Sequence, residues 1–269
     1  MQSGDSVFAG SIPELYDRYL GPALFDSYAE DLARRLADLS SGALLETAAG
    51  TGRLTRVLAR ALPDAVSIVA TDLNQAMLDF AVAQPGGDRV SWRQADALAL
   101  PFEDAGLDAV LCQFGAMFFP DKVAAYREAL RVLKPTGRFL FNIWDMIEAN
   151  TFAQVTTEVL TALFPEDPPL FLARTPHGHH RTGIVADELN MAGFRNVAIE
   201  TVELTSRLPA ARDLAIGFCQ GTPLRSEIEE RRPGGLDAVT EAVASAIAAR
   251  LGAGPISGKM RAHVITASR

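Results

Sequence analysis

A turn of small residues follows a strand-like run, and it is the segment whose residues could do chemistry. Residues 46–52 read ETAAGTG and lead into a helix-like segment. Glycine lets the backbone approach a ligand closely, and the first amides of a helix are unpaired donors. Alone, the Gly-Thr-Gly pattern is equally compatible with a plain strand-to-helix connection, so it needs support from residues nearby in the fold.

Two further acidic residues end the next two strand-like runs. Asp72 belongs to the run 66–73, and Asp96 belongs to the run 90–96. A carboxylate at Asp72 can accept hydrogen bonds from both hydroxyls of a ribose, and Asp96 with the amide of Ala97 suits the edge of an adenine. The alternatives are a helix cap for Asp72 and a strand-end turn for Asp96. Acidic residues at three successive strand ends favour one nucleoside site.

A nicotinamide-binding turn usually carries a third glycine, and this chain has Thr55 at that position. The missing glycine weakens a pyrophosphate site at this turn. An NAD-dependent oxidoreductase therefore stays as an alternative function. A second alternative is a non-catalytic regulatory protein that binds a cofactor with the same fold.

The elements around these motifs alternate between β-rich runs and helix-like segments, which predicts a parallel sheet with helices on both faces. Residues 134–137 (KPTG) predict a stop and a turn after the last of these helices. The expected strands are 43–49, 66–73, 90–96, 107–114 and 137–144, and the expected helices are 53–62, 74–83 and 121–133.

The flanking segments predict a lid and a cap around this core. A helical stretch at 11–39 is interrupted by Gly21-Pro22 and resembles a lid. We expect a single domain, 1–269, with the lid at about 11–40, the cofactor-binding core at about 41–145, and the substrate cap with the C-terminal strands at about 146–269. After the core we expect an amphipathic helix at 151–163, a loop at 165–183, a helix ending at Gly193, a strand at 197–208, helices within 210–251 and a last strand at 263–269.

Composition excludes several classes of protein. The 33 acidic side chains exceed the 25 basic ones, for a net charge of −8, so a nucleic-acid partner is not expected. Hydrophobic residues make up 48% of the chain, yet no run is long enough for a membrane span. The first residues show no export signal, and Cys112 and Cys219 are expected to be buried thiols. We therefore expect a cytoplasmic globular protein.

Together these motifs resemble the class I S-adenosylmethionine-dependent methyltransferases, and more closely their UbiE-like, type 11 small-molecule branch. The likeness covers about residues 12–145 and depends on ETAAGTGRLT, ATDLNQAML, ADALALPF, LDAVLCQFGAMFFPD and REALRVLKPTGRF. It implies a Rossmann-like α/β fold with a helical cap, whose seven-stranded, mostly parallel sheet has an antiparallel last strand. It also implies S-adenosyl-L-methionine as cofactor, S-adenosyl-L-homocysteine as product, and in-line methyl transfer to an O, N or C atom of a small organic molecule.

The resemblance also assigns cofactor-binding positions. Glu46 matches the acidic residue that serves the cofactor's amino group, and it replaces the commoner Asp; Ala48 stands where the family usually has its first glycine. Asp72 matches the ribose ligand, and Asp96 with Ala97 matches the adenine pair. The other matched positions are Gly50 and Gly52 under the methionine part, Leu73, Met77 and Leu98 beside the adenine, Gln113 and Phe114 along the methionyl chain, and Tyr16 and Tyr19 in the lid. For the two tyrosines, plain packing of an amphipathic helix is the alternative.

The acceptor side of the site is less well marked in the sequence. A general base is needed only if the acceptor must lose a proton, so no catalytic residue is assigned. His177, His179 and His180 follow the expected fifth strand, and His177, His179 and Phe118 are the candidate residues of the acceptor pocket. A solvated loop is the alternative for the histidines, and no metal is expected because they have no acidic or thiol partner nearby. A homodimer is also compatible with the sequence.

Overall fold

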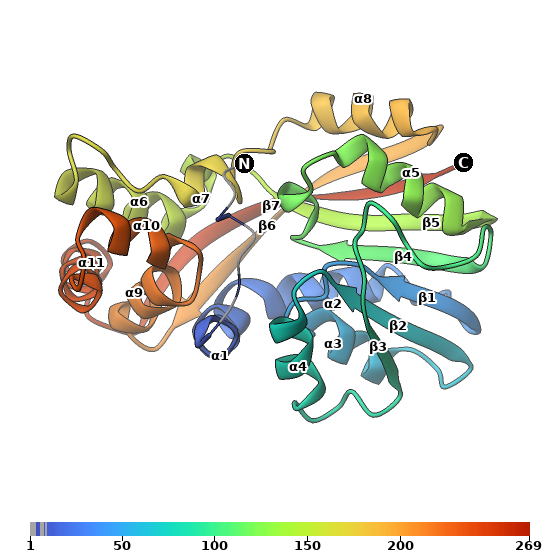
Figure 1. Ribbon diagram of the computed structural model, residues 1–269, viewed down its shortest axis with the longest axis horizontal. Coiled ribbons are helices and arrows are strands. Elements are labelled where there is room, and N and C mark those ends of the chain that lie inside the picture. Colours follow the sequence, from blue (N-terminus) through green and yellow to red (C-terminus); the bar gives the residue numbers. More distant parts are fainter. Residues whose placement is uncertain (1–3, 6–7, 9) are drawn as a thin grey trace.

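The fold is built on one seven-stranded sheet in the strand order β3-β2-β1-β4-β5-β7-β6 (Figure 1). This is a computed structural model that describes residues 4–5, 8 and 10–269. Strands β1 to β5 pair in parallel, and β7 is antiparallel to both of its neighbours, which confirms the predicted sheet. The strands are β1 (Gly42–Glu46), β2 (Val66–Asp72), β3 (Val90–Gln94), β4 (Leu107–Gln113), β5 (Leu133–Trp144), β6 (Asn196–Leu208) and β7 (Ile256–Ser268).

Helices cover both faces of the sheet because its strands alternate their side chains between two apolar clusters. Leu44 of β1 belongs to the cluster under α2 and α3, and Leu45 belongs to the cluster under α5 and α8. The helices are α1 (Ile12–Leu15), η1 (Tyr16–Phe25), α2 (Asp26–Arg34), α3 (Arg53–Ala61), α4 (Gln75–Val82), η2 (Ala116–Phe118), α5 (Lys122–Val132), η3 (Ile147–Ala149), α6 (Thr151–Leu163), α7 (Phe171–Arg174), α8 (Thr182–Ala192), α9 (Ala211–Gln220), α10 (Leu224–Arg231) and α11 (Leu236–Leu251).

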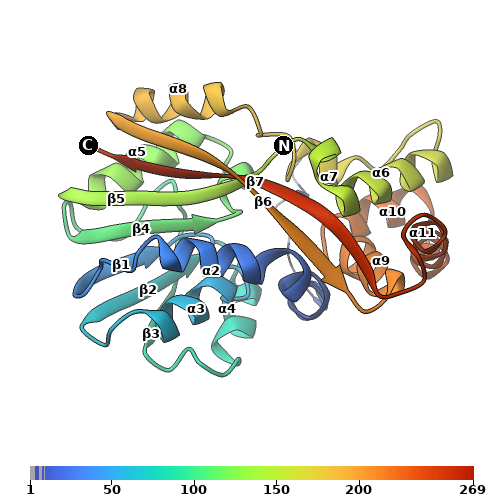
Figure 2. The same cartoon turned by 180° about the vertical axis from the view of Figure 1, so that it is seen from behind.

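Helices α6, α7, α9, α10 and α11 form a cap at one end of the sheet (Figure 1). Figures 1 and 2 show that β6 and β7 leave the sheet together and run into this cap. Residues 256–261 of β7 pair only with β6, while residues 262–268 pair with β5 as well. The last strand therefore begins at residue 256 rather than at the predicted residue 263. Gly258 lies in this extension, where a Cβ atom would meet the ring of Phe152 at 2.8 Å.

The predicted break in the first helix is absent, because the chain passes Gly21-Pro22 as a π-helix, η1. Pro22 has no N–H group, so in i→i+5 bonding it leaves the carbonyl of Asp17 without a helix partner. Nη2 of Arg53 donates a hydrogen bond of 2.6 Å to that carbonyl instead. The proline is thus accommodated by a contact from another helix rather than by a break.

The predicted turn at residues 134–137 is also wrong, because β5 begins directly after α5. Leu133 pairs with Leu107, and the next pair joins Arg138 to Ala109. The KPTG segment therefore forms an irregularity within the strand pair, and a bulge of this kind accepts a proline that cannot donate to the ladder.

Cys112 and Cys219 are both buried and free, as predicted. No helix in the described part of the chain is long and apolar enough to cross a membrane. The residues on which the expectation about an export signal rests, 1–14, lie partly outside the described residues.

Candidate active site

The larger of two cavities lies at the carboxyl ends of β1 to β4. It contains about 970 Å³ of empty space, part of which is open to solvent. Glu46, Asp72 and Asp96 come from three neighbouring strand ends, and all three line it. The same cavity is lined by ten other positions singled out in the sequence: Tyr16, Ala48, Gly50, Leu73, Met77, Ala97, Leu98, Gln113, Phe114 and Phe118.

The turn after β1 places three residues in the left-handed region. Their φ angles are 52° for Ala48, 57° for Gly50 and 79° for Gly52. Gly50 faces open space, since a Cβ atom there would meet nothing within 4 Å. Gly52 does not line the cavity; a Cβ atom there would meet the ring of Trp92 at 2.6 Å, so this glycine allows close packing against β3. Ala48 holds a conformation that costs an alanine more than a glycine.

Asp72 joins the turn after β1 to the end of β2. Its Oδ2 accepts a hydrogen bond of 2.8 Å from the Gly50 amide, and its Oδ1 accepts one of 2.8 Å from the Asn74 amide. Burial raises the pKa of this carboxyl, while the two backbone bonds oppose the rise. Oδ2 keeps a second lone pair, and Oδ1 has in addition only a long contact of 3.5 Å with Nδ2 of Asn74, so Asp72 can still accept hydrogen bonds from a ligand.

Glu46 is the most deeply buried of the three acids, with 1% of its surface exposed. Burial raises its pKa to about 8, the Thr55 hydroxyl opposes the rise with a bond of 2.5 Å, and the charge of Asp72 adds to it. Thr55 stands where a nicotinamide-binding turn would have its third glycine. Its hydroxyl donates a hydrogen bond to the Glu46 carboxyl. Residue 55 thus positions an acidic side chain, whereas the third glycine of a nicotinamide-binding turn allows close packing of the helix.

Asp96 forms the strand-end turn that the sequence offered as its alternative role, and it also lines the cavity. Its Oδ1 accepts a hydrogen bond of 2.9 Å from the amide of Leu98. Leu73 lies on the same cavity with 55% of its surface exposed, which is unusual for a large apolar side chain. The edge formed by Leu73, Ala97 and Leu98 thus combines apolar side chains with a carboxylate.

Gln113 brings an unpaired acceptor to the cavity. Its Nε2 donates to the carbonyl of Phe25 at 2.8 Å, and this bond fixes the orientation of the amide. Its Oε1 is buried and has no hydrogen-bond partner among the described residues. A buried acceptor without a partner costs free energy, so this oxygen suits a ligand that donates a hydrogen bond.

Arg53 holds the lid helix against the helix that follows the glycine turn. Its Nε and Nη2 each lie 2.8 Å from an oxygen of Asp17, and its Nη1 lies 3.1 Å from both oxygens of Asp26. Gly21 makes room for it, because a Cβ atom there would lie 2.4 Å from the guanidinium group. The lid is therefore locked to α3 by a two-carboxylate clamp.

The two lid tyrosines have different positions. Tyr16 lines the larger cavity and stacks on Phe25, with 5.0 Å between ring centroids. Burial, followed by the charge of Asp72, raises the pKa of its hydroxyl. Tyr19 lines neither this cavity nor the one that adjoins it, and its ring lies 5.2 Å from the guanidinium carbon of Arg18 instead.

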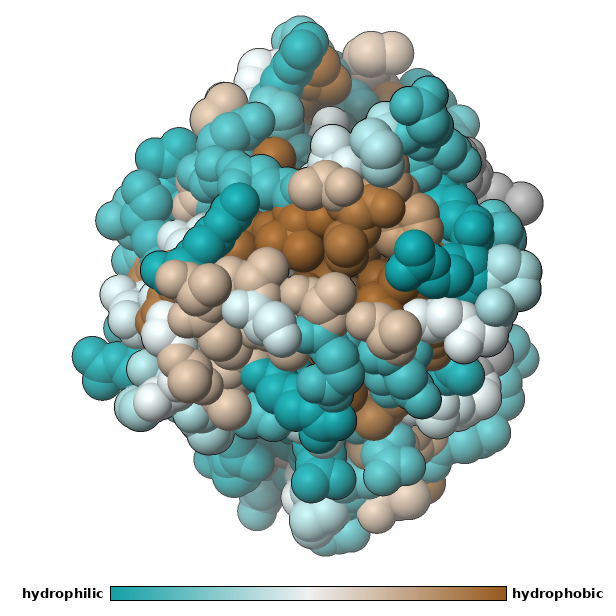
Figure 3. All heavy atoms as spheres, turned by 90° about the vertical axis from the view of Figure 1, so that its left-hand side faces the viewer, coloured by the Kyte–Doolittle hydropathy of each residue, from teal (hydrophilic) through white to brown (hydrophobic). Residues whose placement is uncertain are grey.

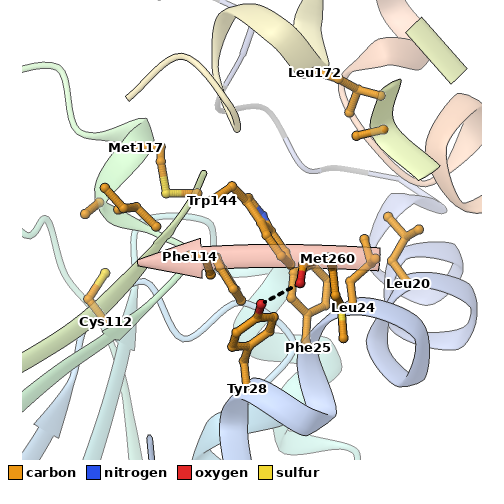
Figure 4. Packing of buried hydrophobic residues seen from close by; sticks show 14 of the residues in the cluster. Leu20, Leu24, Phe25, Tyr28, Cys112, Phe114, Met117, Trp144, Leu172 and Met260 are labelled. Carbon is orange, nitrogen blue, oxygen red and sulfur yellow. Dashed lines mark hydrogen bonds between the residues drawn. The ribbon is translucent and has the colours of Figure 1, made fainter. Parts of the chain in front are cut away.

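A second cavity of about 640 Å³ adjoins the first between the sheet and the cap. Tyr16, Phe25, Phe114 and Phe118 line both cavities. Phe114 stacks on Trp144 with 3.8 Å between ring centroids, and Figure 4 shows this pair packed with Phe25 and Tyr28. The aromatic side chains common to both thus form a wall that the two cavities share near the end of β4.

The histidines predicted for the acceptor pocket do not act together. His177 is buried and lines the second cavity. His179 lines neither cavity of the described chain and lies 3.1 Å from the carboxylate of Glu188. His180 bonds through Nδ1 to the carbonyl of His177 at 2.8 Å. Only His177 and Phe118 of the three acceptor-pocket candidates are thus brought to the second cavity.

Sequence reasoning missed the residues that hold the lid and pack against Phe114. Arg53 and Asp17 lie 36 positions apart, and no pattern in the sequence pairs them. Phe25 and Trp144 read as ordinary core residues of a helix and a strand. The one usable signal was Gly21-Pro22, whose unusual place in a helix marks the slot that Arg53 occupies.

Comparisons with known proteins match the core of the chain. Residues 45–141 match the family described as a methyltransferase domain. The demethylmenaquinone methyltransferase of Deinococcus radiodurans is 34% identical over 143 residues, 52% of this chain and 59% of that protein. The ubiquinone/menaquinone biosynthesis C-methyltransferase UbiE of Hahella chejuensis is 38% identical over 105 residues, 38% of this chain and 42% of that protein. The chain spans about half the length of these curated relatives.

A solved structure matches more of the chain at lower identity. The phosphoethanolamine N-methyltransferase 2 of Haemonchus contortus, in complex with S-adenosyl-L-methionine, aligns over 95% of this chain and 56% of that chain. The TM-score is 0.61 and the identity is 15%, so the likeness concerns the fold alone. The chain has the Rossmann-like fold of S-adenosylmethionine-dependent methyltransferases.

Replacing Arg53→Met should loosen the lid while keeping most of the side chain's volume. We expect faster amide hydrogen exchange across residues 12–25 and a loss of about 1 to 3 kcal/mol in the free energy of unfolding, because Asp26 loses its ion pair and Asp17 keeps only the longer contact with Arg56, at 3.4 Å. Hydrogen exchange and chemical denaturation measure both effects. The control is Arg60→Met, an exposed position on the same helix; equal exchange in both variants would contradict the clamp.

Replacing Glu46→Gln should change how stability depends on pH. A carboxyl whose folded pKa is about 8 takes up a proton on folding between about pH 4.5 and pH 8, so its contribution to stability falls as the pH rises through that window. Glutamine removes this penalty and can still accept the Thr55 bond. The variant should be more stable than wild type at pH 8, on the order of 2 to 4 kcal/mol, and closer to it at pH 5. If the variant and the wild type differ in free energy of unfolding by the same amount at pH 5 and at pH 8, this account is contradicted.

Proposed function

We propose that this chain is a class I methyltransferase of the UbiE-like branch and that it transfers a methyl group from S-adenosyl-L-methionine to a small organic molecule. The observation that carries the proposal is the convergence of Glu46, Asp72 and Asp96 on one cavity that adjoins a second, apolar one. The second cavity supports an enzyme rather than a non-catalytic cofactor-binding protein, because it offers space for an acceptor.

The residues of the larger cavity fit this cofactor in charge and in hydrogen bonding. Asp72 would hold the ribose hydroxyls with its remaining lone pairs, and Asp96 with the Ala97 amide would hold the adenine. The unpaired Oε1 of Gln113 and the carboxyl of Glu46 would receive the ammonium group. Leu73, Met77 and Leu98 would flank the adenine, and Ala48 and Gly50 would leave room for the methionine part, with Tyr16 covering it from the lid. Gly52 and Tyr19 do not line this cavity, so we assign them no contact with the cofactor.

The cofactor supplies a methyl group that is bonded to a positively charged sulfur. The neutral thioether that remains after transfer is a very good leaving group. The chain's own residues need only align the acceptor and exclude water, and alignment of this kind can lower a barrier by roughly 7 to 11 kcal/mol. Phe114 and Phe25, which line both cavities, are placed to keep the meeting point of the two ligands dry. We propose that lid, core and cap act as a single domain around this point.

The acceptor is proposed as a small organic molecule with a ring system. The names of the relatives refer to demethylmenaquinone and to ubiquinone or menaquinone biosynthesis. The lining of the second cavity, with Phe114, Trp144, Phe152, Phe171 and Phe218, supports an apolar acceptor of that general kind.

Assembly, location and other partners remain predictions from the sequence. Figure 3 shows apolar side chains gathered at the centre of the face at the cap end of the molecule, with hydrophilic residues around them. Such a patch is compatible with the homodimer that the sequence allows. A cytoplasmic location and the lack of a nucleic-acid partner likewise stay predictions.

Replacing Asp72→Asn tests cofactor binding. Removing the charge while keeping the shape of the side chain should weaken binding of S-adenosylmethionine and S-adenosylhomocysteine at least about tenfold, or about 1.4 kcal/mol. Titration calorimetry and ligand-induced thermal stabilisation measure this loss. The control is Asp79→Asn, an exposed residue of the neighbouring helix α4. If NAD stabilises the wild-type protein and neither of the other two ligands does, the oxidoreductase alternative replaces the proposal.

A further inference from the structure

The second cavity has few polar side chains, and two of them are already engaged within the chain. Asn150 donates through Nδ2 to three backbone carbonyls, and its Oδ1 accepts from the amide of Arg261 at 2.9 Å. The hydroxyl of Thr222 donates to the carbonyl of Phe218 at 2.7 Å and accepts from the Leu224 amide at 3.2 Å. Neither residue is available to choose between ligands.

Besides the hydroxyl of Tyr16 and the indole N–H of Trp144, this cavity has one ammonium group among the described residues, that of Lys259. Its side chain is 46% exposed, and its Nζ lies 3.6 Å from a carboxylate oxygen of Glu203. An ammonium group in this position remains hydrated and carries little directional preference.

His177 also lines this cavity, and the tautomer of its ring follows from its hydrogen-bond partner. Its Nδ1 lies 2.8 Å from the carbonyl oxygen of Asp145. A carbonyl can only accept, so Nδ1 must carry the hydrogen, and in the neutral ring Nε2 is left with a lone pair. Only 6% of the residue is exposed, and Nε2 makes no hydrogen bond to any described residue. An unengaged acceptor thus belongs to the wall of an apolar cavity.

The surroundings of His177 keep the ring neutral. Burial lowers its pKa to about 4, although the bond to the Asp145 carbonyl opposes this, and the charge of His180 lowers it further. The carboxylates of Asp145 and Glu148 act in the other direction. That of Asp145 is already engaged, 2.5 Å from Nε of Arg261 and 3.2 Å from Nε2 of His263.

We propose that Nε2 of His177 binds the hydroxyl hydrogen of the methyl acceptor and takes its proton during transfer. The inference rests on the proposed function and narrows it. The acceptor would be a flat, apolar molecule that presents one hydroxyl group, since the cavity offers aromatic walls and, at Nε2 of His177, a buried acceptor atom that carries no hydrogen. His177 would then be a catalytic residue, because it touches the reacting group.

The step balances in atoms and in charge. The acceptor oxygen forms its bond to the methyl carbon with a lone pair, the carbon–sulfur bond breaks with its electrons staying on sulfur, and the hydroxyl proton passes to Nε2. One positive charge leaves the sulfur and one appears on the imidazole, so the dry interior holds the same net charge before and after. A weakly basic imidazole suffices, because the oxygen becomes strongly acidic as the new bond forms.

The first test compares binding of 2-naphthol and 2-methoxynaphthalene to the protein saturated with S-adenosylhomocysteine. Wild type should bind 2-naphthol about tenfold more tightly, the value of one hydrogen bond. In His177→Asn the preference should disappear, because asparagine can keep the bond to the Asp145 carbonyl but has no atom in place of Nε2. Lys259→Met is the matched control from the same cavity and should keep the preference. Loss of the preference in Lys259→Met alone, or no preference in wild type, overturns the assignment.

A second measurement on the wild-type protein avoids the folding of a variant. Nitrogen-15 NMR of the labelled histidines should show a protonated Nδ1 and an unprotonated Nε2 for His177 between about pH 6 and pH 8. Adding 2-naphthol should shift the Nε2 resonance, and adding 2-methoxynaphthalene should not. A hydrogen on Nε2, or no response to 2-naphthol, contradicts the proposal.

A single-turnover assay addresses the proton. With S-adenosylmethionine and 2-naphthol, His177→Asn should transfer the methyl group at least about 100-fold more slowly than wild type. Equal rates, or no transfer in either protein while 2-naphthol is bound, overturn the proton-accepting role. If S-adenosylhomocysteine itself fails to bind, the proposed function fails instead, so the two failures are distinguishable.

Discussion

The hydrogen bond between the Gly50 amide and the Asp72 carboxylate is the contact on which the larger cavity depends. It joins the turn after β1 to the end of β2, so two segments 22 positions apart in the chain form one wall of the cavity. Parallel pairing makes the contact possible, because neighbouring parallel strands end at the same edge of the sheet. The same carboxylate accepts a hydrogen bond from the Asn74 amide. Its remaining capacity to accept hydrogen bonds suits a ligand that carries hydroxyl groups.

The end of β4 decides how the two cavities meet. Phe114 has a φ angle of 51°, a conformation that is strained for a bulky residue. Oδ1 of Asn142, on β5, accepts a hydrogen bond of 2.9 Å from the Phe114 amide, and Trp144 stacks on the ring. These contacts hold an aromatic side chain across the boundary between the cavities. Phe114 thus holds a strained conformation in the wall that the two cavities share, which Tyr16, Phe25 and Phe118 also line.

The ionisable groups that line the cavities differ in how their charge is compensated. Burial raises the pKa of Glu46 and lowers that of His177, so both groups favour their neutral forms where no ligand compensates them. Arg53, by contrast, lines the larger cavity as a paired cation, because it lies between the carboxylates of Asp17 and Asp26 and holds the lid. A cation bound beside Glu46 would favour the carboxylate form of this residue. Binding of a cationic ligand in the larger cavity is therefore coupled to the ionisation of Glu46.

The sequence by itself determined the elements and the acidic strand ends, because periodicity of 2 and 3.6 and the turn residues are local properties. It placed Glu46, Asp72 and Asp96 at successive strand ends, and the parallel pairing of those strands brought them together. It misread Gly21-Pro22 as a break and residues 134–137 as a turn, since contacts from Arg53 and from β4 override local preference. The tertiary structure alone decided which histidine faces a cavity: three lie within four positions, and only packing on Asp145 and Trp144 buries His177.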